Sequence, residues 1–393
     1  MPSDRKLPRL VYIGDVPVES TYHGSLLLYR LFSGYPADKL LIVETDLARS
    51  SAERRLPNVN YRRLAVPMSR LMRSRFSKPY AIWLFLTARL RARNVLRQVR
   101  GFRPEAVISI VHNFHWIAAA ELAERLSIPL HLVVHDHFAQ AVIMPQTRLV
   151  SSEPAFKRVY AQARSRLCVS PYMESEYAKR FGVFGTVLYP SRAPDCPDWD
   201  APPVRANNSH TLRVAFAGSI NSGGYARLLK LLAESLEPDE NLVLFGPHTI
   251  ESLKLWNLDA SNIKLGGLLP AAELLQKLRD DFDVLFVPMS FDVAGHADNM
   301  RLSFPSKIAD YTAMGLPLLI CAPEYSSAVR WACDYAPVAE VVTSEAADEL
   351  QKVLERLRSA DYRRSLGNRA LEIGAQLFSY EKAESILHNA LRS

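Results

Sequence analysis

The sequence predicts an α/β protein with two doubly wound domains, each a parallel sheet covered by helices on both faces. Short apolar runs alternate with amphipathic segments along the chain, as is typical of parallel sheets. The alternation stops once, in the proline-rich residues 190–209, and then restarts. The length of 393 residues also exceeds the roughly 250–300 at which single cores stop growing. Two domains joined by a linker are therefore expected.

Each predicted strand is a short apolar run followed by a loop and an amphipathic segment. In the first half, these runs occupy residues 10–13, 40–43, 106–111, 129–134 and 166–170. In the second half, they occupy 212–217, 241–245, 263–265, 283–287, 318–321 and 339–342. Helical periodicity then covers 346–356, 362–376 and 380–391. Each half is therefore expected to build its own sheet.

The composition predicts a folded, cytoplasmic protein without a membrane-spanning helix. Hydrophobic residues make up 48% and charged residues 23% of the chain, which excludes a disordered protein. The uncharged run 106–120 is shorter than the roughly 20 residues that span a bilayer, and it contains two histidines. The apolar run 10–13 is shorter than the roughly 7–15 residues of a signal-peptide core. The cysteines form no Cys-x-x-Cys pair and are expected to be buried thiols in a reducing compartment: Cys168, Cys196, Cys321 and Cys333.

Positive charge is concentrated in the first half. Residues 1–200 hold 29 Lys and Arg against 17 Asp and Glu, whereas residues 201–393 hold 19 against 24, for a net charge of +7. Residues 61–103 contain twelve Lys and Arg and no acid.

The basic residues of this stretch follow a pattern. One predicted helix, residues 82–100, carries Arg89, Arg93, Arg97 and Arg100 on one stripe, and its other faces carry Ile82, Phe85, Leu86, Leu90, Leu96 and Val99. The loop before it interleaves Met72, Phe76 and Tyr80 with Arg70, Arg73, Arg75 and Lys78. Cations beside apolar anchors suit an anionic membrane surface, at about 1 kcal/mol per contact. We expect residues 61–103 to bind such a surface and no nucleic acid. A solvated basic face and a pocket for an acceptor phosphate are the alternatives.

One segment, residues 303–317, predicts a nucleotide-diphosphate site on a short helix. Pro305 suits a first helical position, so Ser306 and Lys307 would present backbone amides at the positive end of the helix dipole. Asp310, one turn further on, could accept hydrogen bonds from a ribose while Lys307 neutralises the diphosphate. The alternative is an ordinary surface helix with a Lys/Asp pair.

A glycine-rich loop, residues 218–224, lies between the first strand and the first helix of the second domain. Gly218 and Gly223 would let backbone amides approach a phosphate, and Ser222 could cap the helix that begins near Tyr225. The loop is neither a Gly-x-Gly-x-x-Gly motif nor a Walker motif. A plain strand-to-helix turn is the alternative.

Three histidines follow one another in His131-Leu132-Val133-Val134-His135-Asp136-His137, at a predicted strand end. Along a strand they would lack the compact geometry of a zinc site, so no metal is expected. The carboxyl end of such a strand opens on a ligand cleft, which makes His135 and Asp136 candidate catalytic residues. A histidine satisfied by backbone groups at the sheet edge is the alternative.

These features, in this order, resemble the GT-B glycosyltransferases, in particular the large retaining, family 4-like group. The resemblance is carried by the Pro-Ser-Lys, acidic-Tyr and Ala-x-Gly-x-Pro elements of residues 305–317, by the loop 218–224, and by Leu265-Gly266-Gly267-Leu268-Leu269-Pro270. It implies two facing Rossmann-like domains, with a C-terminal helix that crosses back to the first. The acceptor-binding domain would be residues 1–200 with 378–393, and the nucleotide-sugar-binding domain 201–377.

The resemblance also implies roles for individual residues. The catalytic residues would be His135, Asp136 and Lys307, and the acceptor side would be formed by Gly24, His23 and His112. The donor would be bound by Gly218, Ser219, Asn221, Gly223, Leu268, Arg301, Pro305, Ser306, Lys307 and Asp310. The chain departs from many retaining members at position 302, where Leu302 replaces a glutamate eight residues before the ribose acid. The mechanism that uses two glutamates therefore cannot be transferred.

The implied function is transfer of a sugar from a nucleotide diphosphate, UDP rather than GDP, to a glycan or lipid-linked acceptor. Retention of configuration is expected, without a metal or other cofactor, at the inner face of the cytoplasmic membrane. If the reaction inverts instead, Asp136 is the candidate base. The alternatives are a sugar-nucleotide epimerase of the same fold and a non-catalytic scaffold or partner subunit.

Overall fold

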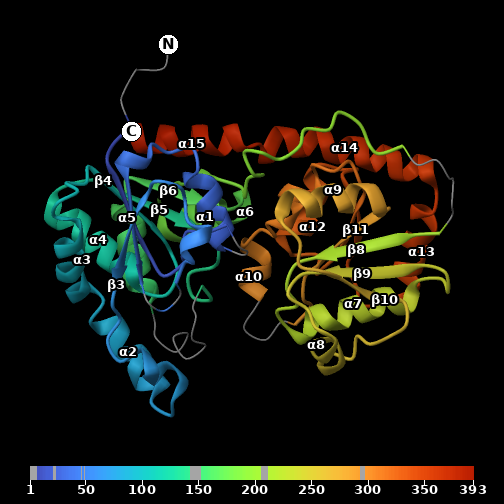
Figure 1. Cartoon of the computed structure of the whole chain (residues 1–393), viewed down its shortest axis with the longest axis horizontal. Coiled ribbons are helices and arrows are strands. Elements are labelled where there is room, and N and C mark those ends of the chain that lie inside the picture. The colour runs from blue at the N-terminus through green and yellow to red at the C-terminus, as the bar shows by residue number, and fades with distance from the viewer. Residues whose placement is uncertain are drawn as a thin grey trace. The chain divides into compact units, whose positions relative to one another are not determined.

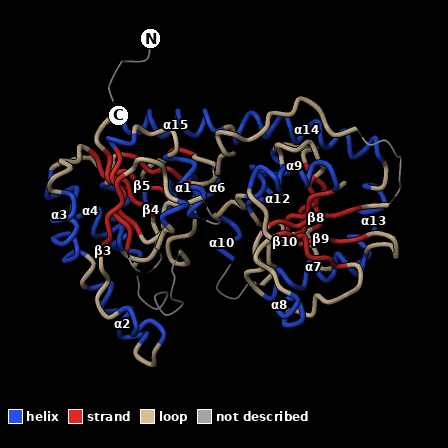
Figure 2. Tube along the Cα trace, viewed as in Figure 1, coloured by secondary structure: helices blue, strands red, loops and turns tan. Residues whose placement is uncertain are grey.

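The structure is a computed structural model that describes residues 7–20, 24–45, 47, 49–141, 152–204, 211–292 and 297–393, with Arg73 by its backbone only. The chain forms two compact units. The first consists of Met1–Pro190, Leu302–Phe304 and Tyr380–Ser393, and the second of Ser191–Arg301 and Pro305–Ser379. Each unit contains one parallel sheet between helices (Figures 1 and 2).

The sheet of the first unit has seven parallel strands. In spatial order they are β3 Asn60–Leu64, β2 Leu40–Thr45, β1 Leu10–Gly14, β4 Ala106–Ile110, β5 Leu130–Val134, β6 Ser165–Cys168 and β7 Thr186–Val187. The α-helices are α1 Gly24–Phe32, α2 Ser77–Leu86, α3 Ala92–Val99, α4 His115–Leu126, α5 Glu153–Gln162, α6 Pro171–Phe181 and α15 Tyr380–Arg392. Short 3₁₀ helices occupy η1 Ala37–Lys39, η2 Ala52–Arg54, η3 Ser69–Arg73 and η4 Arg89–Arg91.

The five strands predicted for this half are confirmed, and two more were missed. β3 is an edge strand that exposes most of its residues, so its sequence, Asn-Tyr-Arg-Arg-Leu, has no apolar run to detect. β7 has only two residues. The central strands β1, β2, β4 and β5 are fully buried, as expected of a sheet covered on both faces.

The sheet of the second unit has six parallel strands. In spatial order they are β10 Ile263–Gly267, β9 Asn241–Phe245, β8 Arg213–Ala217, β11 Val284–Pro288, β12 Leu318–Cys321 and β13 Ala339–Val342, which confirms all six predicted runs. The helices after β8 are α7 Gly223–Ser235, α8 Ile250–Leu255, α9 Ala271–Asp281, α10 Ala297–Leu302, α11 Lys307–Tyr311, α12 Ser327–Asp334, α13 Ala347–Leu357 and α14 Ala360–Phe378.

The last helices follow the predicted periodicity. α13, α14 and α15 cover the three predicted segments, and each starts or ends within about two residues of its prediction, as is usual for helix ends. Ala383, Leu387 and Leu391 of α15 belong to the apolar core of the first unit, together with Leu10 and Tyr12 of β1. The final helix is therefore part of the first unit's core.

The strand orders place a topological switch point in each sheet. The chain runs outward from β1 to β3 and then returns to β4, so the switch lies between β1 and β4; in the second unit it lies between β8 and β11. Loops at the carboxyl ends of strands diverge at such points and leave room for a ligand. Candidate residues follow the carboxyl ends of β1, β4 and β8 at these switch points, and that of β5, the strand next to β4.

Two sequence-based expectations are wrong. Cys168 and Cys321 are buried free thiols, but Cys196 is only half-buried and Cys333 is exposed on α12. The single helix inferred from residue 82 to residue 100 is broken near Thr87, where α2 ends and η4 and α3 follow. Among the residues that the structure describes, no helix is both long and apolar enough to cross a membrane.

Candidate functional site

The proposed phosphate helix begins later than predicted. α11 starts at Lys307 with Ser306 as its N-cap, so Pro305 precedes the helix and does not occupy its first turn. The N–H of Ile308 donates to the carbonyl of Pro305 at 3.1 Å, and the N–H of Ala309 donates to that of Ser306 at 3.1 Å. These i→i−3 bonds tighten the entry into the helix. Ser306 is exposed and Pro305 is half-buried.

The side chain of Lys307 turns onto the end of β8. Its Nζ lies 3.9 Å from the centroid of the Phe216 ring, and a Cβ atom placed on Gly218 would lie 3.2 Å from it. Desolvation lowers the pKa of Lys307 to about 7. The structure therefore brings two predicted donor residues, Lys307 and Gly218, close together at the end of β8.

Two residues that were not predicted hold this arrangement. The Tyr311 hydroxyl accepts the N–H of Ala217 at 2.7 Å, which ties α11 to the last residue of β8. His248, after β9, donates from Nε2 to the carbonyl of Gly218 at 2.8 Å. Burial lowers the pKa of His248, the hydrogen bond to the Gly218 carbonyl opposes this shift, and the neighbouring Lys307 adds to the lowering. Gly218 has a φ of 143°, which side chains rarely adopt.

The rest of the glycine-rich loop leads into α7. Ser222 is the N-cap of this helix and accepts the N–H of Tyr225 at 3.5 Å, which confirms the predicted cap. Asn221 is exposed, whereas Ser219 and Gly223 are half-buried. The amino end of α7 therefore lies five residues after Gly218, and a helix start that closes a glycine-containing loop is a common anion site.

The remaining donor candidates lie around this core of the second unit. Asp310 shares α11 with Lys307 and is half-buried. Leu268 follows Gly267, which has a φ of 79°, and is 65% exposed. Arg301 forms an ion pair with Asp298, with 3.1 Å between Nη2 and Oδ1.

In the first unit, His135 and Asp136 follow β5 directly. His135 Nε2 lies 3.5 Å from Asp136 Oδ2, and their side chains are 9% and 40% exposed. Burial lowers the pKa of His135, and the opposing effect of Asp136 is smaller. A Cβ atom on Gly24, the first residue of α1, would lie 2.6 Å from His135 Cε1. The predicted residues Gly24 and His135 are therefore packed against each other.

The other two histidines of the segment 131–137 have separate partners. His131 Nδ1 lies 2.8 Å from the Ser165 hydroxyl, and His137 Nδ1 lies 3.1 Å from the Tyr177 hydroxyl. Within the described ranges, no group of three or more His, Cys, Asp or Glu residues is placed to hold a metal ion. His23 lies outside the described residues.

A buried Asp–His pair lies at the switch point between β1 and β4. Asp15 Oδ1 lies 2.7 Å from His115 Nδ1 and accepts the hydroxyl of Thr45 at 2.8 Å. Burial raises the pKa of Asp15, but its interactions with His115 and Thr45 outweigh burial and lower the pKa. His112 is close enough to Asp15 and His135 for both to influence its pKa, which burial lowers. The role of His115 was not predicted, although polar residues after both strands were visible in the sequence.

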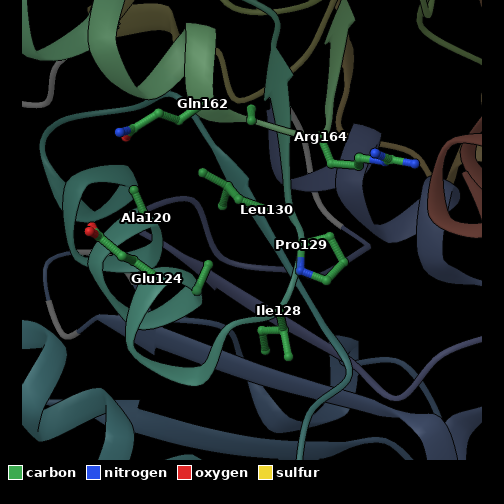
Figure 3. Close-up of a pocket in the computed structure, with 9 residues that line it drawn as sticks. Ala120, Glu124, Ile128, Pro129, Leu130, Gln162 and Arg164 are labelled. Carbon is green, nitrogen blue, oxygen red and sulfur yellow. The ribbon is translucent and has the colours of Figure 1, made fainter.

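A cavity of about 510 Å³ lies elsewhere in the first unit, near the amino end of β5 (Figure 3). α4, α5 and the start of β5 form its walls. Its lining residues are Ala120, Ala123, Glu124, Ile128, Pro129, Leu130, Gln162, Ala163 and Arg164. None of the predicted site residues lines it, because they follow the carboxyl ends of the strands.

No family model and no curated protein matches the sequence. Solved structures do match. HepE from Anabaena in complex with UDP-glucose is 13% identical with a TM-score of 0.67, and the match covers 98% of this chain and 99% of that one. Sucrose-phosphate synthase from Thermosynechococcus elongatus is 14% identical with a TM-score of 0.67 over 98% of both chains. MurG from Acinetobacter baumannii is 12% identical with a TM-score of 0.55, covering 98% and 99%. The predicted GT-B fold, with two parallel α/β sheets, is confirmed.

Proposed function

We propose that the protein is a glycosyltransferase that transfers a sugar from a UDP-sugar to a glycan or lipid-linked acceptor, with retention of configuration. One observation carries the proposal. The Lys307 ammonium lies at the carboxyl end of β8, against Phe216 and Gly218, at the switch point of a GT-B fold. Ligands of open α/β sheets bind at such points, and a cation beside a glycine-rich loop and a helix start suits a diphosphate.

The donor is assigned to the second unit. Lys307 and the amides of the loop 218–224 stabilise the departing nucleotide diphosphate. A fixed positive potential of this kind is often the largest contribution to an enzyme's rate enhancement. Asp310 accepts hydrogen bonds from the ribose, and the backbone around Leu268 faces the base. UDP is favoured over GDP because HepE was solved with UDP and with UDP-glucose.

The acceptor and the reacting sugar are assigned to the first unit. His135 hydrogen-bonds to the donor sugar beside the anomeric carbon. Asp136 orients the imidazole of His135. Gly24, His23 and His112 form the acceptor side. In terms of the sequence, residues 1–200 with 378–393 serve the acceptor, and residues 201–377 serve the donor.

A donor screen tests this function. The purified chain is incubated with UDP- and GDP-sugars and a panel of glycan and lipid-linked acceptors, and nucleotide release is measured. We expect acceptor-dependent release from a UDP-sugar, with the anomeric configuration of the product, read by NMR, unchanged from the donor. Conversion of a nucleotide sugar to its epimer without nucleotide release would instead establish the epimerase. If no nucleotide raises the melting temperature of the protein, the result would favour the non-catalytic scaffold.

Donor affinity should depend on pH near neutrality. The free Lys307 has a pKa of about 7, and a bound diphosphate raises that pKa because it favours the charged form. Below pH 7 the lysine is already protonated and the affinity is constant. Above pH 7 each binding event takes up a proton, so the affinity falls by up to about tenfold per pH unit.

Calorimetry with a UDP-sugar between pH 6 and 9, in buffers of different ionisation enthalpy, measures this proton uptake directly. The diphosphate of a UDP-sugar does not itself titrate in this range, so the uptake reports on the protein. Lys307→Ala should bind more weakly and show no pH slope. A wild-type affinity that is flat across this range would contradict the location of the diphosphate beside Lys307.

A further inference from the structure

An apolar stripe lies on the surface of the basic stretch in the first unit. Ile82 and Leu86 are 49% and 71% exposed on one face of α2, and Leu90, in η4, is 56% exposed. The opposite face of α2 holds Tyr80 and Leu84, each 3% exposed. Both faces of this helix are therefore apolar, and only one of them is covered. We call Ile82, Leu86 and Leu90 the α2 stripe.

The α2 stripe has cations on either side of it. Arg75 and Lys78 precede it, Arg89 lies between Leu86 and Leu90, Arg93 follows, and all four side chains are exposed. In the part of the chain that the structure describes, no carboxylate forms an ion pair with any of these four residues. The guanidinium of Arg75 lies 4.9 Å from the centroid of the Phe76 ring, which is itself 48% exposed.

The structure changes which apolar residues can act as anchors. Tyr80 is not available, since its side chain is buried and its hydroxyl donates to the carbonyl of Pro67 at 2.7 Å. Met72 is half-buried. Ile82, Leu86 and Leu90 had been expected to face away from the arginine stripe of one continuous helix. The break near Thr87 instead leaves them exposed on α2 and η4, beside the cations.

We propose that the α2 stripe inserts into the interface of an anionic membrane while the flanking cations bind lipid phosphates. α2 projects from the sheet of its unit, so a flat surface can reach it (Figure 1). A second copy of the chain is a poor occupant, because it would bring two unpaired cationic surfaces together. This inference rests on the proposed function for the identity of the acceptor, which would be lipid-linked and presented at the membrane. Vesicle binding itself is measured without donor or acceptor.

Insertion and simple electrostatic attraction predict different behaviour. Exposed charges separated by more than roughly 8 Å are screened at physiological ionic strength, so attraction alone is lost when salt is added. Apolar side chains that enter the boundary between headgroups and acyl chains contribute a hydrophobic part of the binding free energy, and salt does not screen this part. The wild type should therefore keep measurable binding to phosphatidylglycerol-containing vesicles at high salt, after the electrostatic part is lost.

The test is co-sedimentation of the full chain with phosphatidylcholine vesicles, with and without phosphatidylglycerol, at low and high salt. The double variant Ile82→Ser/Leu86→Ser should bind roughly tenfold more weakly or worse, because each substitution removes a leucine-sized apolar side chain from the interface. Both positions are exposed, so folding should not suffer. The matched control is Phe184→Ser, an apolar residue of the same unit that is 79% exposed outside the stripe.

Two tryptophan variants report how deeply the α2 stripe enters the membrane. The fluorescence that Leu86→Trp adds to that of the five native tryptophans should be quenched by brominated lipid, whereas the fluorescence that Phe184→Trp adds should not. Arg75→Ser/Lys78→Ser should lose binding mainly at low salt. Equal sedimentation of the double variant and the wild type, or an unquenched Leu86→Trp, overturns the insertion. Binding to heparin that matches binding to vesicles, or dimerisation that the double variant abolishes, would assign the surface to a polyanion or to a second copy.

Donor binding, followed by thermal protection in the absence of vesicles, separates the two proposals. If the variants and the wild type bind a UDP-sugar but not vesicles, the membrane surface fails and the proposed function stands. If the protein binds vesicles but no nucleotide, the proposed function fails and the membrane surface stands.

Discussion

Lys307→Ala should leave a folded protein that binds its donor roughly tenfold to a hundredfold more weakly and transfers almost no sugar. The lost interaction is a charge-assisted contact to phosphate, which is worth about 1.5–3 kcal/mol. Asp310→Ala should weaken donor binding through the ribose instead. Calorimetric titration with a UDP-sugar measures both losses.

The fold should survive the loss of Lys307, because its ammonium is desolvated and its pKa is lowered to about 7, so the folded state gains little from the charge. Thermal melting without ligand should be as high as in the wild type. Lys352→Ala is the matched control, since Lys352 is 72% exposed on α13 and forms only a 3.8 Å pair with Asp348. If both Lys307→Ala and Asp310→Ala bind nucleotide as tightly as the wild type, the α11 site is refuted.

Asp136→Asn should reduce turnover by roughly 10²-fold or more while donor affinity changes little. The substitution keeps the shape of the side chain and removes its charge from beside His135, so the effect falls on the reacting centre. Steady-state kinetics with the donor and acceptor found in the screen separate the two quantities. Asp38→Asn, at an exposed acid of η1 in the same unit, is the control.

Gly24→Ala tests the role of His135, the neighbour of Asp136, without changing the chemistry of either side chain. A methyl group at position 24 would lie 2.6 Å from His135 Cε1, so the imidazole has to move. We expect a lower turnover number with donor affinity retained. Wild-type turnover in both Asp136→Asn and Gly24→Ala would remove the end of β5 from the reaction.

The sequence predicted most of the fold because parallel strands are continuous apolar runs. Every predicted strand is present, and the missed β3 is an exposed edge strand whose sequence contains two arginines and no apolar run. The break between α2 and η4 was missed for a different reason. Residues 82–100 contain no Gly or Pro, the usual signals of a helix break, and α2 is apolar on both sides, so the periodicity shows no interruption at Thr87.

Individual site residues were predicted where local sequence rules apply, but most of the contacts between distant residues were not. Lys307, Asp310 and the loop 218–224 follow local rules for helix starts and glycine turns, and Ser222 caps α7 as expected. The contacts of Tyr311 with Ala217 and of His248 with Gly218 join residues 94 and 30 positions apart. The pair of Asp15 and His115 spans 100 positions. No periodicity or spacing rule reaches that far, so these partners emerge only from the three-dimensional structure.

The bond between Tyr311 and Ala217 has a consequence for the entropy of binding. It attaches α11 to the last residue of β8, and the Tyr311 hydroxyl also lies 3.4 Å from the carbonyl of the same residue. The lysine helix and the start of the glycine-rich loop are thereby ordered when the protein folds, before any nucleotide arrives. When a donor binds, these two segments have already lost their conformational entropy. The donor's binding free energy is therefore not reduced by the cost of ordering them. The phenol of Tyr311 would thus contribute to affinity without touching the donor.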